Sequence, residues 1–156
     1  MAKATPATRA LDKAGVAYEL HAYDYDPEAP RVGLQAAESL GAPPAQVLKT
    51  LMTLVDGNAV CAILASDQEV AMKKLATAAG GKSAQMMKPA DAERITGYRV
   101  GGVSPFGQKR QVPTIVDQAA LAHDRVFVNG GQRGLQLRLA PGDLVSALPA
   151  KVASIT

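Results

Sequence analysis

A glycine-rich segment and a single lysine are the parts of this 156-residue chain with the clearest chemical potential. Residues 98–117 place three glycines, two prolines and the adjacent cations Lys109 and Arg110 between two short apolar runs. Because glycine has no Cβ, its main-chain N–H can approach a ligand closely, and successive N–H groups bind a carbonyl oxygen or an anion. Lys109 and Arg110 would hold a phosphate beside such a cradle. A tight strand connection, in which the glycines only supply positive φ angles, explains this segment equally well.

Lys49 is the only charged residue in the apolar run at residues 47–55. Apolar side chains occur at both parities of that run, which is typical of a strand covered on both faces. Burying an ammonium group is costly unless the group has a partner or a reactive role, so Lys49 indicates a functional site. The alternative is a side chain that reaches solvent from the end of the strand.

The other reactive side chains form no catalytic pattern. Tyr23 and His21 share one face of a predicted strand, where Tyr23 offers a hydroxyl and His21 titrates near neutral pH, although a lone histidine is more often structural. Cys61 lies in an apolar strand and is interpreted as a core residue. The sequence shows no nucleophile elbow and no metal-ligand spacing. We therefore expect no metal and no other cofactor, and little general-base equipment.

Composition predicts one globular domain over residues 1–156, with 47% hydrophobic and 20% charged residues. We expect a cytoplasmic protein, because no run is long enough to cross a membrane and no secretory signal is present. A single cysteine excludes an intrachain disulfide. The formal charge is −2 for residues 1–66 and +5 for residues 67–156. This asymmetry favours a polyanionic partner, with a solvated basic face as the alternative.

Hydrophobic periodicity and turn residues predict helices that alternate with strands. The predicted helices are 5–15, 32–40, 66–79, 89–95 and 141–148, and the predicted strands are 17–23, 47–55, 59–65, 98–100, 112–116, 125–129 and 135–139. The helix at 66–79 is expected from the capping-box spacing of Ser66 and Glu69. Hairpins interleaved with helices favour an α+β fold with a mixed, largely antiparallel sheet.

Several strings, in this order and spacing, resemble the YbaK/EbsC family of free-standing aminoacyl-tRNA deacylases, which is related to the editing domain of bacterial prolyl-tRNA synthetases. They lie at residues 5–7, 20–27, 49–51, 73–74, 96–109, 113–117, 130–135 and 141–144. The resemblance implies a partly closed sheet flanked by helices. It also implies a cytoplasmic enzyme that hydrolyses the ester of mischarged Cys-tRNA(Pro), with Cys-tRNA(Cys) as a second candidate. The expected partners are aminoacyl-tRNA and prolyl-tRNA synthetase.

The same resemblance implies roles for individual residues. Lys49 matches the family's essential lysine, Tyr23 a pocket tyrosine, and Gly101 the backbone that faces the aminoacyl group. The matched strings add a substrate-binding set: Thr50, Gly102, Ser104, Pro105, Asn129, Gly130 and Gly131. Candidates for contact with tRNA phosphates are Lys73, Lys74, Lys109, Arg110 and Arg133. In this family the substrate's own cysteine thiol is expected to attack the carbonyl carbon, so the enzyme need not supply a nucleophile.

Two positions depart from the family string. Asn129 stands where a serine is common, and Gln132 stands where a lysine is common, so both amino-acid preference and tRNA affinity are open. Excluding one methylene from a pocket is worth only about 1–3 kcal/mol. An Ala-tRNA(Pro) deacylase on the same scaffold is therefore the closest alternative. A non-catalytic module that binds tRNA or a synthetase is the alternative from another class, although it would not need Lys49 within an apolar strand.

Overall fold

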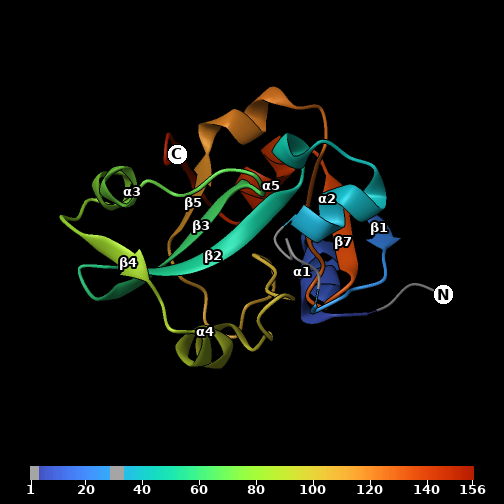
Figure 1. The fold of residues 1–156 in the computed structure, drawn as a ribbon, viewed down its shortest axis with the longest axis horizontal. Helices are drawn as coiled ribbons and strands as arrows, with labels where there is room; N and C mark the ends of the chain where they lie inside the picture. The colour runs from blue at the N-terminus through green and yellow to red at the C-terminus, as the bar shows by residue number, and fades with distance from the viewer. Residues whose placement is uncertain (1–3, 29–33) are drawn as a thin grey trace.

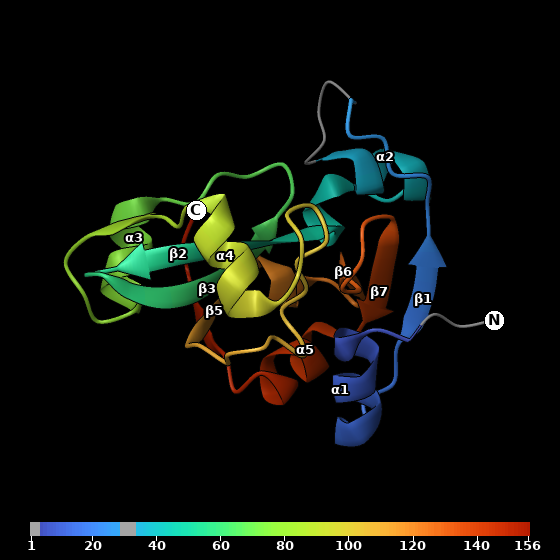
Figure 2. The same cartoon turned by 90° about the horizontal axis from the view of Figure 1, so that it is seen from below.

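The computed structural model describes residues 4–28 and 34–156, which form two β-sheets flanked by helices (Figures 1 and 2). The smaller sheet is antiparallel, in the order β1-β7-β6. Its strands are β1 (Glu19–Ala22), β6 (Val126–Asn129) and β7 (Leu135–Leu139). The larger sheet is mixed, in the order β4-β2-β3-β5-β8. Its strands are β2 (Leu48–Val55), β3 (Asn58–Ala65), β4 (Ala84–Met86), β5 (Thr114–Asp117) and β8 (Lys151–Ala153). The α+β class with mixed and antiparallel sheets is confirmed. The expected single, partly closed sheet is wrong, because the described strands form two separate sheets that do not close.

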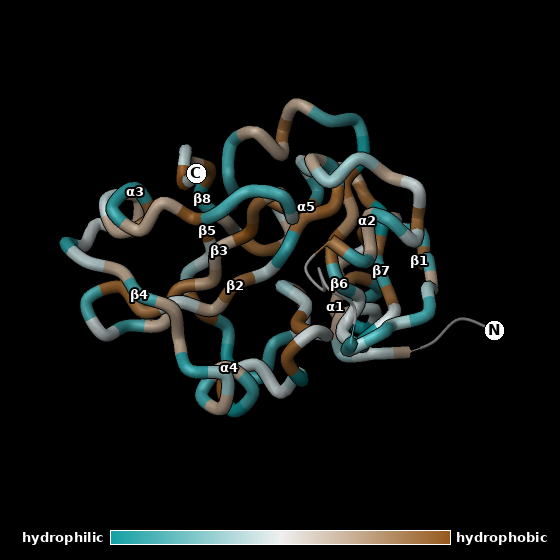
Figure 3. Tube along the Cα trace, in the orientation of Figure 1, coloured by the Kyte–Doolittle hydropathy of each residue, from teal (hydrophilic) through white to brown (hydrophobic). Residues whose placement is uncertain are grey.

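The main core fills the space between the two sheets. Strand β7 alternates buried leucines with polar residues, and Leu137 and Leu139 enter this core. They meet one face of β2 and β3, which contributes Met52 and Ile63. Figure 3 shows the same pattern, with hydrophobic colour along the central strands and hydrophilic colour at many outer turns. Alternation in each strand thus fixes which face is buried.

Helices cover the outer faces of the sheets. α3 (Met72–Ala78) packs Leu75 on the far face of the larger sheet. α2 (Gln35–Leu40) places small alanines against Phe127 on the outer face of the smaller sheet. α4 (Pro89–Thr96) and α5 (Pro141–Ala147) complete the cover of the main core. No helix within the described ranges is long and apolar enough to span a membrane.

The N-terminal helix α1 (Pro6–Ala14) also anchors a distant loop. The Thr5 side chain caps α1 by accepting a hydrogen bond from the Thr8 N–H, and Gly15 ends the helix in the left-handed conformation. The Thr5 hydroxyl donates to the Gly130 carbonyl at 2.6 Å. The start of α1 is thereby tied to the loop that follows β6.

Most predicted elements are confirmed within a few residues. The helix predicted at residues 66–79 is present, but its predicted start at Ser66 is wrong. Ser66 is buried, its N–H donates to the Val47 carbonyl at 2.9 Å, and its hydroxyl donates to the Pro44 carbonyl. The capping side chain is therefore used in tertiary contacts, and α3 begins only at Met72. Residues 32 and 33 of the predicted second helix lie outside the described ranges.

The strand predicted at residues 98–100 is also wrong, because this segment forms a turn. The Gly102 N–H donates to the Arg99 carbonyl at 2.8 Å, and the buried Tyr98 hydroxyl donates to the Phe106 carbonyl at 2.6 Å. Tyr98 thus anchors the glycine segment in the core, and residues 98–100 do not pair with a strand. The short strands β4 and β8 were not predicted.

Candidate active site

A pocket of about 300 Å³ lies at an open edge of β2, beside the smaller sheet. Strand β4 pairs only with Thr53–Val55, and the Met87 N–H donates to the Met52 carbonyl. On that side, no described strand pairs with residues 48–51. Backbone and side chains of this stretch therefore line the pocket together. The other wall includes Tyr23, Tyr25, Val100, Gly101, Asn129 and Gln136.

Lys49 is the only charged residue among the described residues that line this pocket. Its side chain is half-buried, and burial lowers the pKa of its ammonium group, while the charges of Glu69 and Asp67 act in the opposite direction. No ion pair joins Lys49 to a carboxylate within the described residues. The pocket thus contains a partly desolvated cation that is available to a ligand.

Tyr23 reaches the same pocket from the segment after β1. Its backbone N–H donates to the Gly134 carbonyl at 2.8 Å, and this bond holds the backbone from which the Tyr23 side chain extends. Burial raises the pKa of its phenol, although the neighbouring Gln136 side chain acts to lower it. The raised pKa keeps the hydroxyl protonated, so Tyr23 offers a neutral hydrogen-bond donor at neutral pH.

Gly101 forms the wall opposite β2 with a φ of +90°, a conformation that L side chains rarely adopt. A Cβ at this position would lie 2.8 Å from the Tyr25 hydroxyl and 3.2 Å from Nε of Arg133. Arg133 Nε donates to the Val100 carbonyl at 2.8 Å, and its guanidinium lies 5.3 Å from the Tyr25 ring centroid. The Gly101 backbone therefore lies tightly against two side chains that contact each other.

Asn129 connects the two loops at the rim of the pocket. Its Nδ2 donates to the Gly101 carbonyl at 3.2 Å, and its Oδ1 accepts from the N–H groups of Gly131 and Gln132 at 2.7 and 3.2 Å. A serine side chain is shorter by one heavy atom and carries no amide, so it would not bridge both loops in this way. Asn129, which stands where a serine is common in the family string, therefore links the two loops in this chain.

We expect Asn129→Ala to lower kcat/KM for ester hydrolysis about tenfold, because misplacing a pocket wall is costly for catalysis. The melting temperature should fall little, since the hydrogen bonds are near the surface. Single-turnover hydrolysis of charged tRNA measures the effect. An unchanged rate would show that the Gly101 loop holds its position without Asn129.

The other predicted substrate-binding residues do not share one location. Thr50 lines the pocket, whereas Gly102, Ser104, Pro105, Gly130 and Gly131 are not among its lining residues. Ser104 is fully buried, and its Oγ accepts a hydrogen bond from the Phe106 N–H at 3.2 Å. At Gly102, a Cβ would lie 2.8 Å from the Arg133 backbone nitrogen. These residues shape and support the loops of the site instead of lining it.

The five predicted tRNA-binding cations are also spread over the molecule. Lys73 and Lys74 lie on α3, and Lys74 Nζ donates to the Thr156 carbonyl at 2.7 Å. Lys109 is exposed. Arg133 bonds to the Gly101 loop at the active-site pocket, as described above.

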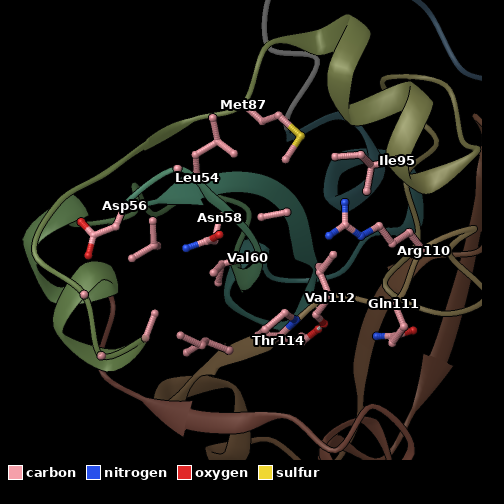
Figure 4. Close-up of a pocket in the computed structure, with 18 of the residues that line it drawn as sticks. Leu54, Asp56, Asn58, Val60, Met87, Ile95, Arg110, Gln111, Val112 and Thr114 are labelled. Carbon is pink, nitrogen blue, oxygen red and sulfur yellow. Dashed lines mark hydrogen bonds between the residues drawn. The ribbon is translucent and has the colours of Figure 1, made fainter.

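Arg110 lines a second, larger cavity of about 720 Å³ at the β2–β3 turn. Figure 4 shows its guanidinium extending into this cavity beside Ile95. The walls combine apolar residues of β2 and β3 with Asp56 and Asn58. Arg110 thus lines this second cavity, whereas Arg133 contacts Tyr25 and Val100, which line the active-site pocket.

Cys61 and His21 lie outside the pocket lining. Cys61 is fully buried, and burial raises the pKa of its thiol to about 12. The thiol is therefore not ionised at neutral pH, and the core interpretation is confirmed. His21 packs edge-on against Phe127, with ring centroids 5.3 Å apart, and lies 3.2 Å from a Glu19 carboxylate oxygen.

We expect Cys61→Ala to leave kcat/KM unchanged and to lower the free energy of unfolding by about 1 kcal/mol, because only a small buried group is removed. Hydrolysis assays and thermal unfolding of the purified variant test both parts. A large loss of activity in a variant with native stability would contradict the structural role of Cys61.

Sequence reasoning did not find Gln136, Tyr25 or the methionines of the pocket. Gln136 pairs with both His21 and Asn129 in the smaller sheet, so it shares their face. The alternation of β7 predicts that face correctly, but it does not reveal that the face is covered. The methionines that line the pocket are Met52, Met86 and Met87.

The aminoacyl-tRNA editing domain model matches residues 27–147 of this chain. The chain belongs to this family. Among its relatives is "Putative Cys-tRNA(Pro)/Cys-tRNA(Cys) deacylase EbsC" of Enterococcus faecalis, which is 40% identical over 77% of this chain and 74% of that protein. A second is "Multifunctional Ser/Thr-tRNA deacylase ProXp-y" of Escherichia coli, which is 30% identical over 63% of this chain and 62% of that protein.

A solved structure supports the fold of this editing-domain protein. The structure titled "Crystal structure of a putative trans-editing enzyme for prolyl tRNA synthetase" superposes with a TM-score of 0.82 at 24% identity and covers 99% of both chains. The superposition confirms the expected fold.

Proposed function

We propose that this protein hydrolyses the ester of mischarged aminoacyl-tRNA and that Cys-tRNA(Pro) is its principal substrate. The observation that carries this proposal is the pocket at the open edge of β2, which combines Lys49, the Tyr23 hydroxyl and the Gly101 backbone. A lone, partly desolvated ammonium group beside neutral donors suits an ester, whose carbonyl oxygen becomes negatively charged during the reaction. Family membership and the named activities of the relatives support the same reaction class.

In the proposed mechanism, Lys49 holds the carbonyl or ribose end of the ester, and main-chain N–H groups near Gly101 stabilise the developing oxyanion. The cysteine thiol of the substrate attacks its own carbonyl carbon. A C–S bond forms as the ester C–O bond breaks, and the thiol proton passes to the ribose oxygen. The released cyclic thioester then reacts with water to give free cysteine. This route requires no nucleophile from the protein, which is consistent with the inert Cys61.

The remaining parts of the proposal concern partners. Arg133 is well placed to contact the tRNA next to its aminoacyl end, because it contacts the Val100 carbonyl and the Tyr25 ring, and both of these residues line the pocket. Lys73, Lys74, Lys109 and Arg110 would contact phosphates further from the ester. Prolyl-tRNA synthetase is the proposed source of the mischarged tRNA, and the cytoplasm is the proposed site of action.

The test is hydrolysis of Cys-tRNA(Pro), Ala-tRNA(Pro) and Pro-tRNA(Pro) by the purified protein. We expect fastest cleavage of the cysteinyl ester and no cleavage of the prolyl ester above the buffer rate. Faster cleavage of the alanyl ester would favour the alternative specificity on the same scaffold. If no ester is cleaved above the buffer rate but labelled tRNA is retained, the protein is a binding module and the enzymatic proposal is wrong.

A further inference from the structure

Two buried polar atoms in the pocket have no hydrogen-bond partner within the described residues. They are Oε1 of Gln136 and Oγ1 of Thr50, and both residues line the pocket. Gln136 is only 5% exposed. A buried acceptor without a partner costs free energy in a folded protein, so such atoms call for an explanation. A ligand that donates a hydrogen bond would provide one.

The sheet fixes the direction of Gln136. Its neighbour Leu137 enters the main core, so Gln136 must point to the opposite face, where it pairs across the sheet with Asn129. Its side chain lies next to the Tyr23 hydroxyl. Burial raises the pKa of that phenol, and the Gln136 side chain acts in the opposite direction, as an amide N–H donor does. With the amide nitrogen used toward Tyr23, the Oε1 acceptor remains for the pocket.

The charges of the pocket restrict which donor this acceptor receives. Lys49 is cationic, and no carboxylate is among the described residues that line the pocket. The α-ammonium group that all aminoacyl esters share is repelled by Lys49, so it is disfavoured as the donor within the pocket. A neutral side-chain donor avoids this cost. On a small aminoacyl ester, the neutral donors of the side chain are a hydroxyl or a thiol.

We propose that Gln136 determines amino-acid specificity by accepting a hydrogen bond from the side-chain hydroxyl or thiol of the aminoacyl group, with Thr50 as the second polar contact. This inference rests on the proposed deacylase function and extends it. The substrate class is then serine, threonine and cysteine esters, and alanine esters are disfavoured because they leave the buried acceptor unpaired.

The experiment compares tRNA(Pro) charged with serine, cysteine, alanine or α-aminobutyrate. The last has nearly the shape of cysteine but carries a methyl group in place of the donor. We expect wild-type kcat/KM to be at least about tenfold lower for aminobutyryl than for seryl or cysteinyl esters, which is the usual effect of one unpaired buried acceptor. In Gln136→Met, which keeps the side-chain length, the seryl-to-aminobutyryl ratio should fall toward one.

Gln108 provides a matched control. It is 8% exposed and its Oε1 also lacks a partner, but it contacts Met52 and Cys61 in the core and does not line the pocket. Gln108→Met should therefore leave the ratios between esters as they are in the wild type. Thermal unfolding shows whether both variants fold. If Gln136→Met does not fold, Gln136→Asn replaces it, because asparagine keeps the amide but is one methylene shorter and so moves the acceptor away from the ligand.

Each result decides a different claim. Equal wild-type cleavage of aminobutyryl and seryl esters would overturn the role of Gln136 and leave the deacylase proposal intact. The same holds if Gln136→Met slows all esters equally. The cysteinyl-to-aminobutyryl ratio also contains the nucleophilic role of the thiol, so the seryl-to-aminobutyryl ratio is decisive: if that ratio persists in Gln136→Met, the inference is wrong. Absence of cleavage of every ester would overturn the deacylase proposal together with this inference.

Discussion

Replacing Lys49 by methionine is expected to lower kcat/KM for Cys-tRNA(Pro) hydrolysis at least about 100-fold, the usual effect of removing one group that stabilises an oxyanion. Methionine keeps most of the apolar stem and removes the charge. Lys49 supplies the only charge among the lining residues that the structure describes, and none of the others is a cation that could replace it. Single-turnover hydrolysis of labelled aminoacyl-tRNA measures the loss.

The same variant should unfold at an unchanged or higher temperature. Burial lowers the pKa of Lys49 in the folded protein. At any pH below the folded pKa the side chain is protonated in both states, so its burial destabilises the fold. Removing the charge removes that cost.

Lys82→Met is the control for the Lys49 variant, because Lys82 is an exposed lysine outside the pocket. It should retain wild-type hydrolysis. Full activity of Lys49→Met would exclude the proposed role of the ammonium group, while a fall in melting temperature would contradict the stability argument.

Gly101→Ala is expected to lower hydrolysis about 100-fold, since displacing a pocket wall by about 1 Å has effects of this size. The new methyl group would meet the Tyr25 hydroxyl and Arg133 Nε. These two side chains are held against each other and against the Val100 carbonyl. The strain is therefore relieved by moving the loop away from the ester rather than by a simple side-chain rotation.

Gly57→Ala separates this local effect from the general cost of a left-handed residue. Gly57 has a φ of +84°, close to that of Gly101, but a Cβ there would meet no atom within 4 Å. Both substitutions should cost about 1 kcal/mol in unfolding free energy through the backbone alone. Only Gly101→Ala should lose activity, and equal activity of the two variants would contradict a wall function for Gly101.

The predicted hairpin of β2 and β3 and the helix ends at glycine were confirmed because they depend on local patterns. A turn at Asp56 and Gly57 and a left-handed Gly15 are decided by residues close in sequence. The false helix start at Ser66 has the opposite cause. Its side chain binds Pro44, which is distant in sequence, and a capping pattern does not reveal that competition.

The same distinction explains what could be predicted of the site. Lys49 is noticeable because a charge within an apolar strand is unusual in the sequence itself. Gln136 occupies an ordinary polar position of an alternating strand, and its importance arises only because the pocket covers its face. Ser104 and Pro105 belong to a distinctive string, but they lie in the packing beneath the loop.

The bond between the Thr5 hydroxyl and the Gly130 carbonyl has a consequence for protein engineering. The family model begins at residue 27, so a graft cut at that boundary would lose α1 together with Tyr23 and Tyr25. It would retain Lys49 and Gly101 but release the loop that Thr5 fastens. The smallest transplantable unit must therefore include Thr5, well before the start of the recognised domain.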